Sequence, residues 1–169
     1  MYRKQLSKLV AHVTEDLNMN VLLVPMHMEE SDVALCKQLK KQASKSEQIQ
    51  ILGSDTLSPS ELRSCMSAAK LMIGFRLHSN IIAVSSGVPS LNIYYVDKGR
   101  VFFDQIKQSD FAIPIESVLQ PDFEKSSQAL IQKLLGGRMV YQAAISTQTK
   151  LLRNDIRNTW NKTMDGDAS

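Results

Sequence analysis

The sequence predicts a Rossmann-like three-layer α/β/α domain with a parallel sheet. Five short apolar runs alternate along the chain with segments of helical periodicity. The first run, "VLLVP", is wholly apolar, which is typical of a parallel strand covered on both faces. The length of 169 residues, with 43% hydrophobic residues, suits one domain with a sizeable core. Such strands are joined by right-handed helical crossovers, so helices are expected on both faces of the sheet.

The five expected strands are short and are bounded by turn residues. They are "VLLVP" closed by Pro25, "QIQILG" closed by Gly53, "KLMIG" closed by Gly74, "PSLNIYY" and "FAIPI". The first of them is rich in valine and leucine, as expected for a buried strand. In a parallel sheet of this class, ligands bind beyond the carboxyl ends of the strands.

Helical periodicity predicts the elements between these strands. A helix opens the chain over residues 2–17 and ends at Asn18. After the first strand, Ser31 and Asp32 are candidate N-caps of the second helix. The best-defined boundary is the "SPSE" sequence that begins at Ser58, because it combines a capping box with proline at the first helical position.

Short helices follow the third and fourth strands, and two longer helices close the chain. The closing helices are expected over residues 122–136 and 138–163. The last residues, "MDGDAS", are expected to form a disordered tail over 164–169. The sequence therefore predicts one domain over residues 1–163.

Composition excludes several classes of function. The formal charge of +3 is mild, and no basic run is interleaved with aromatic residues, so no nucleic-acid partner is expected. No apolar stretch is long enough for a transmembrane segment or arranged like an export signal, so we expect a cytoplasmic protein. The two cysteines lack the spacing of a disulfide scaffold or a zinc site.

Arg76 and His78 follow the third expected strand, where the next helix begins. Free backbone N–H groups and the positive end of the helix dipole favour an anion at such a place, and arginine can hold a carboxylate or phosphate with two parallel hydrogen bonds. A histidine beside that anion can transfer a proton near neutral pH or donate a hydrogen bond. The structural alternative is that Arg76 pairs with a nearby carboxylate and His78 caps the helix.

Other polar residues are expected at the same edge of the sheet. His27 lies just past "VLLVP", and Tyr95 and Lys98 follow "PSLNIYY". Lysine adds a point charge for phosphate, and tyrosine is a second candidate ligand contact. A loop histidine without function and an exposed turn around Tyr95 and Lys98 are the alternatives.

Two segments resemble one enzyme family. The string "IGFRLHSNIIAVSSGVPSLNIYYVDK" resembles the hallmark segment of the polysaccharide pyruvyl transferases, in which Arg-Leu-His follows a strand and Gly-Val-Pro and Tyr-x-x-Lys come later. The earlier "VLLVPMHMEESD" is similar to the Pro-x-His segment of that family, with its aspartate a few residues on. Phe75 before the arginine, Ser79 and Asn80 after the histidine, and Val96-Asp97 depart from the usual pattern. Together the segments span residues 20 to about 107.

The resemblance implies a bacterial enzyme of cell-surface polysaccharide synthesis. Such enzymes move pyruvate from phosphoenolpyruvate onto two hydroxyls of a sugar or of a lipid-linked oligosaccharide, without a metal or other cofactor. Their fold resembles that of GT-B glycosyltransferases. The chain would be the C-terminal half, so the N-terminal half-domain would be missing, the chain alone would be inactive, and its uncovered apolar surface would favour a homo-oligomer.

The resemblance also implies roles for the residues at the strand ends. Arg76 would bind an anionic group of the donor, with Lys98 and Tyr95 as further substrate contacts. His78, aided by His27, would act as the catalytic acid or base.

Two other functions remain open on the sequence alone. A half of a nucleotide-sugar-dependent GT-B glycosyltransferase would use the same strand ends for a diphosphate, although its ribose-binding carboxylate has only Glu116 as a candidate. A non-catalytic binding module is the second alternative.

Overall fold

The computed structural model describes residues 2–26, 30–53 and 57–166. Its α-helices are α1 (Tyr2–Ala11), α2 (Glu30–Gln42), α3 (Pro59–Ser67), α4 (Leu77–Ser85), α5 (Asp97–Gln105), α6 (Phe123–Gly136) and α7 (Arg138–Gly166). Its strands are β1 (Val21–Leu23), β2 (Ile49–Ile51), β3 (Met72–Gly74), β4 (Ser90–Tyr94) and β5 (Ala112–Pro114). Shorter helical turns are η1 (His12–Asp16), η2 (Ser46–Gln48), η4 (Ser109–Phe111) and η5 (Ile115–Leu119).

All strand pairs in this part of the chain are parallel, which confirms the predicted α/β class. β1 pairs with β2, and β4 lies between β3 and β5. The strands form two sheets, with orders β1-β2 and β3-β4-β5, where a single sheet was expected. The apolar runs could not predict this interruption. An apolar run indicates that a strand is buried, but it does not indicate which strand pairs with it.

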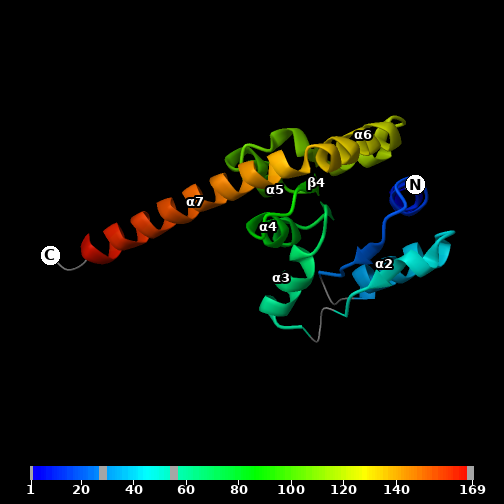
Figure 1. Ribbon diagram of the computed structural model, residues 1–169, viewed down its shortest axis with the longest axis horizontal. Coiled ribbons are helices and arrows are strands. Elements are labelled where there is room, and N and C mark those ends of the chain that lie inside the picture. Colours follow the sequence, from blue (N-terminus) through cyan, green and yellow to red (C-terminus); the bar gives the residue numbers. More distant parts are fainter. Residues whose placement is uncertain (1, 27–29, 54–56, 167–169) are drawn as a thin grey trace.

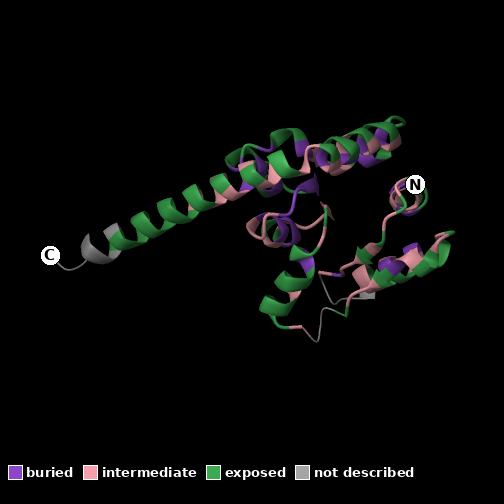
Figure 2. Cartoon of the chain, viewed as in Figure 1, coloured by how far each residue is buried: buried purple, intermediate pink, exposed green. Residues whose placement is uncertain are grey.

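Helices cover both faces of the β3-β4-β5 sheet and produce the predicted layers. On one face, Asn92 of β4 contacts Asn80 of α4. On the other face, Leu91 belongs to the main apolar cluster with Leu9 of α1 and Ile131 of α6. The core is therefore centred on β4, of which four residues are buried, and Figure 2 shows the buried residues gathered around it.

The last helix leaves the body of the domain. α7 contacts α6 and α4 along its first half and then extends beyond them as a lone helix (Figure 1). Its outer half is exposed (Figure 2), including Ile156 and Trp160. The helix ends at Gly166, so residues 164–166 are helical where a disordered tail was expected, and residues 167–169 lie outside the described part. None of the helices in the described ranges has the length and apolar character needed to cross a bilayer.

Several boundaries lie where the sequence predicts them. Asn18 has a φ of 47° and ends the first helical segment, whose last turn is the π-helical η1. Ser58 caps α3 in a reciprocal capping box with Glu61. The second helix differs, because it begins at Glu30 and places Asp32 inside its first turn instead of at the N-cap.

Gly74 allows α4 to pack closely against the end of β3. A Cβ atom at Gly74 would overlap the side-chain amide of Asn80, which is 0% exposed. We expect Gly74→Ala to lower the free energy of unfolding by about 1–3 kcal/mol, the usual cost of overpacking. Gly136→Ala is the matched control, because nothing lies within 4 Å of its added methyl group. Urea unfolding checks this, and equal stability of the two variants would contradict the close approach.

Candidate functional site

The carboxyl ends of β3 and β4 bring four of the predicted site residues to one edge. Gly74 lies opposite Asn92 in the parallel register, so the segments after both strands emerge on the same side. Arg76 is the N-cap of α4, and His78 lies in the first turn of that helix. Tyr95 follows β4, and Lys98 lies in the first turn of α5. His27 falls outside the described residues.

Arg76 makes a two-point ion pair with Asp32 of α2. Its Nε and one terminal nitrogen donate to the two carboxylate oxygens, each at 3.0 Å. The side chains are 34% and 26% exposed, so the pair is partly shielded from water. Parallel double hydrogen bonds of this kind fix the plane of a guanidinium as well as its position. The structural alternative for Arg76, a pairing with a nearby carboxylate, is thus what the structure shows.

The pair leaves the arginine able to bind a second anion. A guanidinium carries five N–H donors, and two of them face Asp32, so donors remain for a ligand beside the nearby Tyr95. The pKa of Arg76 is raised above its ordinary value, first by the hydrogen bond to Asp32 and to a smaller extent by the nearby Tyr95. Arg76 is therefore a permanent cation at the beginning of α4.

The negative charge of Asp32 affects two further side chains. Burial raises the pKa of the Cys36 thiol, and the carboxylate of Asp32 raises it further. The same two causes, in the same order, raise the pKa of the Tyr2 phenol. Both groups are therefore held in their neutral forms, and Arg76 is the cation that balances Asp32.

Buried amides hold the backbone on which Arg76 is carried. The carbonyl oxygen of Arg76 accepts from the Ser79 hydroxyl at 2.7 Å and from the Asn80 side chain at 3.3 Å. The same Asn80 amide donates to Asn92 of β4 at 3.0 Å. These hydrogen bonds connect the first turn of α4 to the central strand β4 and fix the position of the Arg76 backbone.

His78, Tyr95 and Lys98 are all exposed at this edge. Tyr95 is 54% exposed. The side chains at the beginning of α4 and α5 can therefore reach a ligand from solvent without any part of the fold opening. A histidine, an arginine with further N–H donors and a lysine together suit a small anionic substrate.

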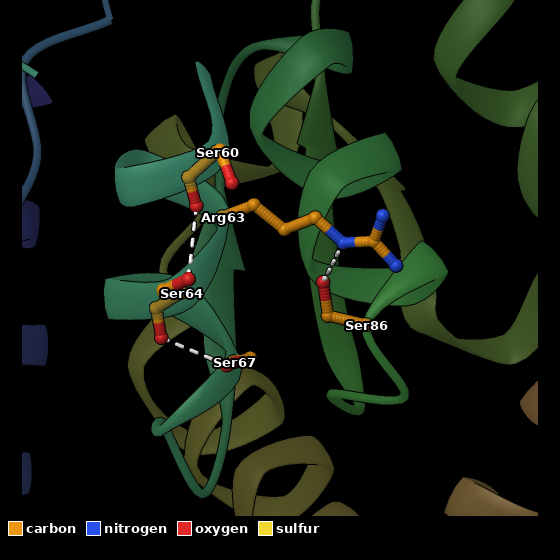
Figure 3. A pocket seen from close by; sticks show the side chains of 5 residues that line it. All are labelled: Ser60, Arg63, Ser64, Ser67 and Ser86. Carbon is orange, nitrogen blue, oxygen red and sulfur yellow. Dashed lines mark hydrogen bonds between the residues drawn. The ribbon is translucent and has the colours of Figure 1, made fainter. Parts of the chain in front are cut away.

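A separate polar hollow lies at the other end of α4. Four serines and Arg63 line it (Figure 3): Ser60, Ser64, Ser67 and Ser86. Arg63 donates to the Ser86 hydroxyl and to the carbonyl oxygen of Ser85, both at 3.2 Å. These groups belong to the carboxyl end of α4, where the helix dipole disfavours an anion. The hollow is therefore distinct from the Arg76 site, and its arginine caps a helix.

Sequence reasoning left Asp32 and Asn92 out of the site. The sequence identified Asp32 as a candidate N-cap and as the aspartate of the Pro-x-His segment. Neither feature predicted that it pairs with Arg76. Asn92 is a buried amide between Leu91 and Ile93 of β4, 1% exposed. A polar residue in such a strand needs a buried partner, and that requirement is the signal that could have identified it.

The two motifs that meet at the Arg76–Asp32 pair are shared with a known family. No solved structure matches the chain at a significant level. The sequence model of one family, described as polysaccharide pyruvyl transferase, matches residues 1–97. This match covers 97 of the 169 residues and includes Asp32, Arg76 and His78. The chain therefore belongs to the polysaccharide pyruvyl transferase family.

Proposed function

We propose that this chain holds the anionic donor of a pyruvyl transfer reaction. The donor is phosphoenolpyruvate, and the acceptor is a sugar, free or in a lipid-linked oligosaccharide, of a bacterial cell-surface polysaccharide. The observation that carries the proposal is the Arg76–Asp32 pair, which joins the two family motifs across 44 positions of sequence at the beginning of α4. Family membership supports the class of reaction, and this ion pair supports the position at which the donor binds.

The reaction requires little beyond binding and proton transfer. A proton adds to the methylene carbon of the enol, and a cationic carbon stabilised by its oxygen results. One sugar hydroxyl adds to that carbon, phosphate leaves, and a second hydroxyl closes the cyclic ketal. The two hydroxyl protons balance the equation, since one replaces the proton given to the methylene carbon and the other leaves with phosphate. The substrates supply every atom, so the chain must hold two anionic groups and move protons.

The residues at the edge suit these tasks. Arg76 holds the carboxylate or the phosphate through its remaining N–H donors, while Asp32 fixes the plane of its guanidinium. His78, two residues on, gives or takes the proton. Lys98 and Tyr95 reach the same ligand from the beginning of α5 and the loop before it. His27 remains a proposed helper of His78.

The proposed enzyme has a second half. In GT-B-like enzymes the donor lies between two Rossmann-like halves, and the present domain corresponds to the C-terminal one. The exposed positions of His78, Tyr95 and Lys98 support this arrangement, because an acceptor and a second wall of the cleft need that space. We place the enzyme in the cytoplasm, where phosphoenolpyruvate is made.

Binding to the chain as it stands tests the donor assignment. We expect phosphoenolpyruvate to raise the melting temperature in a concentration-dependent way, while uridine and guanosine diphosphates have smaller effects. Arg76→Ala should abolish the shift, and Arg63→Ala should preserve it, because Arg63 is the arginine of the separate hollow. Stronger stabilisation by a nucleoside diphosphate would favour the glycosyltransferase alternative. Binding is the readout because we expect no turnover without the second half.

A further inference from the structure

The two sheets of this domain are separated at one position. Their orders are β1-β2 and β3-β4-β5, and every pair is parallel. One added parallel strand between β1 and β3 would give the order β2-β1-new-β3-β4-β5. If the new strand came first in the chain, this order would be 3-2-1-4-5-6, that of the doubly wound dinucleotide-binding fold. The observed orders agree with this fold at every position except the one between β1 and β3.

The backbone directions of β1 and β3 agree with an open position between them. The carbonyl oxygen of Leu23 accepts from Leu52 beyond β2, and the N–H of Met72 donates to Pro89 before β4. Successive residues of a strand direct their backbone groups to opposite sides. The N–H and C=O groups of Leu22 and Ile73 therefore point away from the partner strands that the structure shows. Each is available to a further strand on that side.

The side chains of these strands are less covered than their composition requires. β1 is wholly apolar, yet Leu22 is 43% exposed and its two neighbours are only half-buried. In β3, Met72 and Ile73 are also half-buried. By contrast, four of the five residues of the central strand β4 are buried. Apolar runs of this kind are typical of strands inside a parallel sheet that is covered on both faces, so a strand seated beside them is expected to be apolar as well.

Tyr2 marks the place where the missing strand would end. Its ring packs edge-on against Phe75, just after β3, with centroids 6.2 Å apart. Its pKa is raised by burial and by the charge of Asp32, in the helix that follows β1. Tyr2 thus lies at the beginning of α1, against the residue that follows β3 and near Asp32 of α2. A parallel strand between β1 and β3 would have its carboxyl end at this residue.

We infer that the space between β1 and β3 is the seat of a sixth strand, an apolar segment of the polypeptide that leads directly into α1. The strand runs parallel to both neighbours, and α1 is the right-handed crossover from it to β1. Its backbone pairs with Leu22 on one side and Ile73 on the other, so it joins the two sheets into one. In the observed structure, the Arg76–Asp32 pair and the contacts of α1 with α2 and α6 link the parts of the domain that contain the two sheets.

The experiment adds the strand and measures backbone protection. One variant carries, ahead of Tyr2, about six alternating valine and isoleucine residues followed by a short turn. The matched control has the same length with proline at the second and fourth positions, because proline cannot donate to a ladder. Hydrogen exchange is followed at Leu22 and Ile73, and at Met72, whose N–H already donates to Pro89.

We expect the strand variant to slow exchange at Leu22 and Ile73 by at least about tenfold relative to the proline control, with a smaller change at Met72. Equal exchange in the two variants would overturn the inference, and so would protection of only one of the two edges. Protection that rises with protein concentration would instead indicate a second copy on the edge. If the variant does not fold, the same apolar strand is added as a free peptide to the unaltered chain, with the proline peptide as control. Neither readout involves phosphoenolpyruvate, so the outcome is independent of the proposed function.

Discussion

Replacing Arg76 with alanine is expected to weaken phosphoenolpyruvate binding by on the order of 2–5 kcal/mol, which is roughly thirty-fold to several-thousand-fold in Kd. The loss is large because the change removes the donor side of a charged hydrogen-bond pair and leaves the bound anion unpaired. Arg76 also donates two hydrogen bonds to Asp32, so the variant removes this cation from beside the carboxylate at the same edge. Both effects repel an anionic ligand. Titration calorimetry on the chain measures the Kd directly.

Three comparison variants make this result specific. Arg76→Lys keeps the charge but loses the planar fork, so we expect an intermediate affinity. Asp32→Asn keeps the shape of the partner and removes its charge, so binding should weaken less than in Arg76→Ala. Arg63→Ala should bind normally, because its guanidinium caps the far end of α4. An Arg76→Ala variant with unchanged donor affinity would show that the arginine serves only its ion pair.

The elements of this fold could be predicted because their signals are local. The capping box at Ser58 and the apolar runs of β1 and β4 depend on residues next to one another in sequence. Strand pairing is not local, so the sequence of one strand does not show which strand lies beside it. The interruption between β1 and β3 was therefore visible only in three dimensions. The helical continuation to Gly166 was missed because glycine and aspartate in the last residues favour a frayed end.

The candidate site could be predicted in part for the same reason. Ligands bind at the carboxyl ends of parallel strands, and the end of a strand can be recognised from neighbouring residues in the sequence. Arg76 and His78 could therefore be predicted as site residues. The partner of Arg76 could not be read this way, because Asp32 precedes it by 44 positions and reaches it only through folding. Spacing alone also could not show that Asn80 and Asn92 form a buried support beneath the site.

Replacing His78 with alanine should act on turnover instead of binding. His78 lies at the open beginning of α4 and is exposed, so its removal should leave both the fold and the Arg76–Asp32 pair intact. If it gives or takes the proton of the reaction, kcat in the proposed two-half enzyme should fall by about a hundredfold or more, the usual scale for a general acid or base. The donor Kd, measured by calorimetry, should stay nearly unchanged, because Arg76 carries the anion.

A conservative variant and a second histidine separate proton transfer from a structural role. His78→Gln keeps a hydrogen-bonding side chain but cannot transfer a proton, so it should be as slow as His78→Ala. His12→Gln is the contrast. His12 is 5% exposed and pairs with Asp16 at 2.7 Å, so its replacement should lower stability while the folded enzyme keeps its turnover. Wild-type turnover in His78→Gln would remove proton transfer from His78. The catalytic acid or base would then have to be sought among the other groups at this edge, beginning with Tyr95 and Lys98, because they enter from the neighbouring strand end β4 and can reach the same anion.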